Sequence, residues 1–101
     1  MKVDQKGHTT YIKDTQGDLA SFLGKVTHEY KTFEKQNIII DIKAYKSLSV
    51  KEVNSFLPLS KLHKKAKKSF VIVAQEMDFN AISAKLAVVR SLHEAHDIIE
   101  M

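Results

Sequence analysis

Three short runs of β-branched and aliphatic residues constrain the fold of this chain more than any other feature. They are Ile38–Ile42, Phe70–Ala74 and, more weakly, Leu86–Val89, and they contain almost no polar residue. Strands that are covered on both faces have this uninterrupted pattern, whereas a strand with one wet face alternates apolar and polar residues. The runs therefore predict three strands side by side in one sheet, with helices packed on it.

The segment from Leu19 to Phe33 predicts an amphipathic helix. Its apolar residues recur at intervals of three and four, which places them in a single stripe. Asp18 is suited to cap the N-terminus of this helix because its carboxylate accepts backbone N–H bonds. Asn37 tolerates the left-handed conformation that ends many helices, so we expect it to end this one.

A second helix is predicted from about Val50 to Lys68. It opens on a capping box, in which the Ser49 hydroxyl and the Glu52 carboxylate each satisfy a free backbone N–H. Pro58 has no N–H to donate, so we expect it to kink this helix or to split it in two.

The remaining segments complete an α/β pattern. Lys2–Asp14 predicts a hairpin that turns at Gly7, Asp78–Ile82 one or two helical turns, and the capping box Ser91–Glu94 the start of a last helix. Buried strands that alternate with helices favour parallel pairing. We therefore predict a single α/β domain over residues 1–101, with a small, mostly parallel sheet, an N-terminal hairpin and helices packed on the sheet.

Composition narrows the classes of function. The chain has no Cys, which excludes a disulfide framework, a zinc thiolate site and thiol catalysis. No apolar run approaches the roughly 18 residues of a membrane span. The first residues contain no apolar signal region. We expect a soluble cytoplasmic protein with no membrane partner, present as a monomer or a weak dimer.

Motifs for catalysis and for metal binding are not recognisable. The three Gly residues are too scattered to form a phosphate-binding loop. Among the five His residues, only His93 and His96 are one helical turn apart, and zinc needs three or four ligands. We expect no enzymatic activity, no cofactor and no bound metal.

The net charge of +4 comes from one lysine-rich segment, and the rest of the chain is close to neutral. Its lysines are Lys61, Lys64, Lys65, Lys67 and Lys68. The spacing predicts a basic helix face of Lys61, Lys64, Lys65 and Lys68, opposite a buried face of Leu59, Leu62 and Ala66. Such a basic face is either a solvated surface that complements the helix dipole or a contact for nucleic-acid phosphates.

Ligands of open α/β sheets usually bind beyond the carboxyl ends of the strands. The polar residues expected at this edge are Lys43, Tyr45, Ser47, Ser49, Gln75, Glu76, Asp78, Arg90 and Ser91, and they show no familiar catalytic spacing. Ser49 has two interpretations. It is a helix cap, and its position at the start of a helix would also favour a covalently bound phosphate.

The run Ile38-Ile39-Ile40-Asp41-Ile42, followed by a capped helix and by Phe70-Val71-Ile72-Val73, resembles the STAS domain. That family includes the anti-sigma factor antagonists and the cytoplasmic domains of sulfate transporters. The resemblance implies a non-catalytic regulatory module that binds a protein partner. Where the family carries an Asp-Ser-Ser-Gly segment with a phosphoserine, this chain has Ser47-Leu48-Ser49-Val50, and Ser49 is the nearest match. The expected interaction surface comprises Ser47, Ser49, Lys43, Tyr45, Lys51 and Asn54.

A second stretch, formed by Phe56–Ser60 and His63–Val73, is similar to small bacterial STAS-like proteins that are labelled ribonuclease Z. The true nuclease is a much larger enzyme that builds a two-zinc site from a His-x-His-x-Asp-His motif, and this chain lacks that motif. The similarity leaves one alternative function. The chain would be an accessory protein of that enzyme that associates with RNA through its basic helix face.

Overall fold

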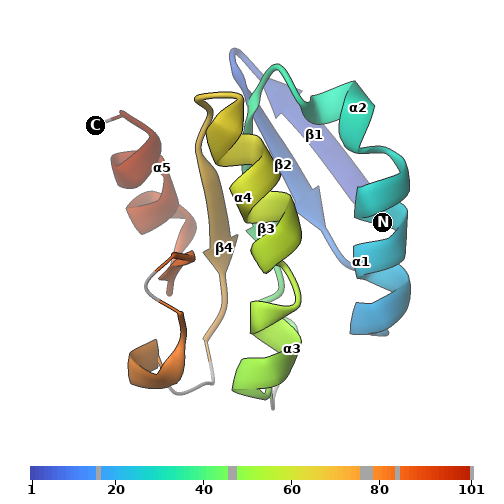
Figure 1. The fold of residues 1–101 in the computed structure, drawn as a ribbon, viewed down its shortest axis with the longest axis vertical. Coiled ribbons are helices and arrows are strands. Elements are labelled where there is room, and N and C mark those ends of the chain that lie inside the picture. Colours follow the sequence, from blue (N-terminus) through green and yellow to red (C-terminus); the bar gives the residue numbers. More distant parts are fainter. Residues whose placement is uncertain (16, 46–47, 76–78, 84, 101) are drawn as a thin grey trace.

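The computed structural model describes residues 1–15, 17–45, 48–75, 79–83 and 85–100. One five-stranded sheet organises the molecule, with the strands in the order β1-β2-β3-β4-β5 (Figure 1). The strands are β1 (Lys2–Lys6), β2 (Thr9–Lys13), β3 (Asn37–Asp41), β4 (Phe70–Val73) and β5 (Ala87–Val89). β1 and β2 are antiparallel, and the other three pairs are parallel. The predicted α/β class, the hairpin and the mostly parallel sheet are confirmed.

The three apolar runs form three neighbouring strands, β3, β4 and β5. β3 and β4 lie inside the sheet. All their residues are buried except Asn37, the first residue of β3, which is half-buried. β5 lies at the edge and is only partly buried, in keeping with its weaker pattern. The hairpin turns at Gly7, whose φ of 61° is the left-handed conformation that glycine adopts readily.

Helices cover both faces of the sheet (Figure 1). One face is covered by α1 (Leu19–His28), α2 (Tyr30–Phe33), α3 (Val50–Asn54) and α4 (Leu57–Lys65). α5 (Leu92–Glu100) packs on the opposite face, and a short 3-10 helix, η1 (Phe79–Ala81), precedes β5. None of the helices described is long and apolar enough to cross a membrane.

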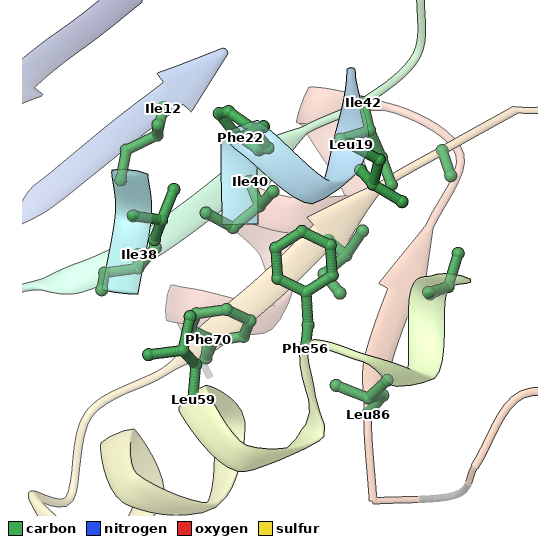
Figure 2. Close-up of a cluster of buried hydrophobic side chains, with 14 of the residues drawn as sticks. Ile12, Leu19, Phe22, Ile38, Ile40, Ile42, Phe56, Leu59, Phe70 and Leu86 are labelled. Atoms are coloured by element: carbon green, nitrogen blue, oxygen red, sulfur yellow. The ribbon is translucent and has the colours of Figure 1, made fainter. Parts of the chain in front are cut away.

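The larger core lies between the sheet and α1–α4 (Figure 2). Phe22 of α1 and Phe56, just before α4, meet edge to face with their ring centroids 6.4 Å apart. Alternate residues of the strands, such as Ile38 and Ile40, point into this core, whereas Ile39 points to the α5 side. This alternation explains why Ile38, Ile39 and Ile40 in the middle of β3 are all apolar.

The first predicted helix differs from the structure in two ways. It is interrupted at Glu29, which separates α1 from α2, although the apolar stripe stays buried on both sides. Two residues earlier the Thr27 hydroxyl donates to the Leu23 carbonyl, a back-bond that bends helices. The prediction that Asn37 ends the helix is wrong. Asn37 begins β3, and its side-chain oxygen accepts the Ser69 N–H at 3.0 Å.

The second predicted helix is split, as Pro58 suggested. α3 ends at Asn54 and α4 begins at Leu57, with Pro58 in its first turn. A proline is tolerated there because the first N–H groups of a helix have no intrahelical acceptor. α4 ends at Lys65, three residues before the predicted boundary, and this earlier end changes how the lysines are arranged.

Candidate functional site

The carboxyl ends of β2 and β3 hold two buried carboxylates, Asp14 and Asp41. The Tyr45 hydroxyl donates to Asp14, and the Tyr11 hydroxyl donates to Asp41. Asp41 also accepts the backbone N–H of Lys43 at 2.9 Å. Burial, then the bond to the carboxylate, raises the pKa of each tyrosine well above its usual value. Both phenols therefore stay protonated: Tyr11 links β2 to the end of β3, and Tyr45 links the loop after β3 to the residue that follows β2.

Ser49 stands at the exposed start of α3 and forms the predicted capping box. Its hydroxyl accepts the Glu52 N–H at 3.1 Å, and the Glu52 carboxylate accepts the Ser49 N–H at 3.1 Å. The seryl oxygen is thus held beside a carboxylate at the surface. A negatively charged group attached to this oxygen would lie next to the Glu52 carboxylate.

A groove of about 300 Å³ runs between α1 and α3, beside Ser49. α1 contributes the apolar residues Leu19, Ala20 and Leu23, and α3 contributes the polar wall of Lys51 and Glu52, followed by Ser55. The groove is formed by residues of two separate helices. No pattern in the sequence indicates that these helices lie side by side, so the groove was not predicted. We refer to this groove and the adjoining Ser49 as the α3 edge.

Only part of the expected interaction surface lies at the α3 edge. Lys51 lines the groove, and Tyr45 is half-buried beside the loop after β2. Lys43 reaches toward the other face of the sheet, where its ammonium group lies 4.0 Å from Asp41. The Asn54 side chain accepts the Ser83 N–H at 3.3 Å. Ser47 lies outside the described residues, as do Glu76 and Asp78.

Three of the residues expected farther along the carboxyl ends of the strands are described by the structure. Gln75 and Arg90 are exposed. The Ser91 hydroxyl accepts the Glu94 N–H at 3.2 Å and caps α5.

Of the predicted basic helix face, Lys61, Lys64 and Lys65 lie exposed on α4, whereas Lys68 does not belong to the helix. α4 ends at Lys65, and Lys67 adopts a left-handed φ of 61°, so Lys68 lies beyond the helix. The expected buried face holds for Leu59 but not for Leu62, which is 49% exposed, or for Ala66, which is exposed. The buried face of α4 consists of Leu59, Ser60 and His63.

His63 is a buried polar residue that the sequence did not reveal. Its Nε2 donates to the Gln36 carbonyl at 2.6 Å, and its Nδ1 therefore accepts the Tyr30 hydroxyl at 2.8 Å. Burial lowers the pKa of His63, and Lys68 lowers it further. The ring is also packed against Tyr30 and Phe70, with centroid distances of 5.6 and 6.1 Å, and these contacts with residues distant in the sequence explain its burial.

Within the described ranges, no three His, Asp or Glu side chains gather closely enough to hold a metal ion. His93 pairs with Asp97 at 3.6 Å on exposed α5 instead of facing His96. Comparison of the sequence with protein-family models finds no match, and comparison with curated proteins finds no relative.

Proposed function

We propose that this chain is a non-catalytic interaction module of the STAS type, which binds a protein partner at the α3 edge. The observation that carries this proposal is the groove between α1 and α3, with its apolar floor and charged wall next to an exposed serine. The N-terminal hairpin and the alternation of parallel strands with helices support this proposal. A regulatory module needs a docking surface rather than a set of reactive groups.

The groove fits a partner that inserts one or two apolar side chains. Leu19 and Leu23 are one helical turn apart and line the floor. Lys51 and Glu52 on the opposite wall offer one charge of each sign to polar groups at the rim of the interface. The central apolar contact would supply most of the binding energy, and the charged rim would orient the partner.

Ser49 is the regulatory residue of this proposal. Phosphorylation would place nearly two negative charges next to the Glu52 carboxylate, which now accepts the Ser49 N–H. The repulsion would open the capping box and move the start of α3, which forms one wall of the groove. Partner binding would then depend on the modification state.

The first experiment identifies the partner with a photo-crosslinking residue at Ser55, inside the groove. The same residue at His28, on a different surface of α1, serves as the control. A protein captured at Ser55 but not at His28 is then purified, and its affinity is measured by calorimetry.

The decisive variant is Ala20→Asp, which places a charge on the floor of the groove. Ala20 is the second residue of α1, where an acidic side chain favours the helix, so folding should be preserved. We expect affinity to fall at least about tenfold, since the carboxylate would be desolvated in the complex. His93→Asp also introduces a carboxylate at the second position of a helix, α5, at the expense of the His93–Asp97 pair, and should leave affinity unchanged. Equal affinity of Ala20→Asp and the wild type would exclude the groove as the docking site.

The regulatory part is tested with Ser49→Asp and Ser49→Ala. Aspartate keeps a capping oxygen but adds a charge beside Glu52, whereas alanine removes the cap without adding a charge. We expect the aspartate variant to bind the partner more weakly than the alanine variant. If both bind like the wild type, Ser49 has no role in regulation.

A further inference from the structure

Lysines that are distant in the sequence lie at the same end of the sheet, the end where the parallel strands begin. The α3 edge is at the opposite end. Parallel strands β2, β3 and β4 begin at the lysine-bearing end, and α2 and α4 end there, at the top of Figure 1. The lysines of this edge are Lys6, Lys35, Lys64, Lys65, Lys67 and Lys68, and we call this set the basic edge. It replaces the single helix face that the sequence suggested.

Hydrogen bonds hold the connections of this edge against one another. The Asn37 N–H donates to the His8 carbonyl at 2.8 Å, which joins the hairpin turn to the start of β3. The Ser69 N–H donates to the Asn37 side chain at 3.0 Å, and the Ile38 N–H donates to the Ser69 carbonyl at 2.8 Å. The lysines next to these residues are therefore carried on one rigid backbone and not on independent loops.

A fourth connection joins the same edge. The Lys64 ammonium donates to the carbonyl of Lys85, just before β5, at 2.5 Å. Lys85 is itself exposed. Glu34 is the single acidic side chain among the described residues of these four connections. The connections span residues 7–8, 34–36, 66–69 and 82–86. The edge therefore carries a strong positive charge.

Capping of α4 does not account for these lysines. The carbonyls of His63 and Lys64 accept backbone N–H groups of the following residues, Ala66, Lys67 and Lys68. The helix end is thus satisfied by its own backbone, and its dipole corresponds to only about half a charge. No ammonium group of the basic edge forms an ion pair with a carboxylate in the described part of the chain. Apart from that of Lys64, which donates to the Lys85 carbonyl, these ammonium groups remain available to an external anion.

We propose that the basic edge binds the phosphate backbone of a nucleic acid. Neighbouring strands are about 4.8 Å apart, so the span from Lys6 on β1 to Lys68 before β4 is about 14 Å. Several consecutive phosphates can match this width. The aromatic side chains of the adjoining elements, Tyr30, Phe33 and Phe70, are buried and offer no surface for base stacking. Binding is therefore independent of base sequence and strongly dependent on salt.

The test measures the fluorescence anisotropy of a labelled oligouridylate of about 20 nucleotides across a series of salt concentrations. The wild-type protein is compared with Lys35→Gln/Lys67→Gln. Each lost phosphate contact reduces the slope of log affinity against log salt by about 0.7 for a single strand, so the expected reduction is about 1.4. At low salt the double variant should bind at least about tenfold more weakly.

The matched control is Lys2→Gln/Lys13→Gln. These two residues face each other at the far end of the hairpin and are exposed, so this variant has the same net charge as the test variant. The control should keep the wild-type slope. Thermal melts of both variants verify that they are folded.

Three outcomes would overturn the proposal. The wild-type protein fails to bind the oligouridylate at low salt, or the test and control variants lose affinity equally, which would reflect net charge without a site. The third is that labelled polyglutamate binds as tightly as the oligouridylate, which would assign the basic edge to an acidic protein. Because the basic edge and the α3 edge share no residue, each proposal can fail without the other.

Discussion

At the scale of single residues, His63 shows how a titratable group can be stabilised in one protonation state. The neutral ring satisfies both of its nitrogen atoms, one through the Gln36 carbonyl and the other through the Tyr30 hydroxyl. A proton on Nδ1 would force the Tyr30 hydroxyl to turn its own proton away from that atom. It would also put a charge in the core near Lys68. The folded state therefore favours the neutral ring.

This preference gives a pH dependence of stability with a definite sign. The pKa of His63 is lower in the folded protein than the ordinary value of 6.5, so the unfolded chain binds more protons in acid. The free energy of unfolding should fall as the pH drops below about 6.5, with a slope of at most about 1.4 kcal/mol per pH unit from this residue. Urea denaturation between pH 7.5 and 5.5 measures it.

His63→Gln removes the titration and should remove this part of the slope, although the variant is less stable at every pH. His28→Gln alters an exposed histidine and should keep the slope of the wild-type protein. The same slope in His63→Gln and His28→Gln would show that the acid sensitivity arises elsewhere.

At the scale of elements, recurring apolar residues predict where helices lie. A helix end is not predicted when no capping residue, Gly or Pro stands at it. Two helix caps, Asp18 and Ser49, and the break at Pro58 were predicted. Each follows from the chemistry of the residue itself: a side chain that accepts backbone N–H bonds, or a proline that has no N–H to donate. The end of α4 was missed, because the chain continues with good helix formers and no Gly after Lys65. The break at Glu29 was missed because the apolar stripe continues across it.

The backbone is strained at Lys67, just after the end of α4. Lys67 occupies the position after the cap of α4 with a φ of 61°, where glycine is usual and other residues are strained. Lys67→Gly should therefore raise the free energy of unfolding by about 0.5–1 kcal/mol. Lys67→Ala removes the same charge without relieving the strain, so it is the control. A glycine variant no more stable than the alanine variant would contradict this account of the helix end.

At the scale of the whole molecule, the sheet was predictable and the two candidate surfaces were not. Strands β3 and β4 are specified by their own composition, and the hairpin by Gly7. The groove, in contrast, requires α1 and α3 to lie side by side, and the basic edge requires Lys6, Lys35 and Lys67 to meet. Contacts between residues that are far apart in the chain have no local signal, which is why both surfaces emerged only from the fold.

The same architecture predicts how stability is distributed over the sheet. β3 and β4 are paired on both sides and covered on both faces, so their amides open only when the whole sheet unfolds. β1 is exposed along its length and paired on one side only. Hydrogen–deuterium exchange should therefore be slowest at Ile39, Ile40, Val71 and Ile72 and fastest, among the strands, in β1. Protection of β1 equal to that of β3 would mean that a second surface covers this edge in solution, because nothing within the described chain shields it.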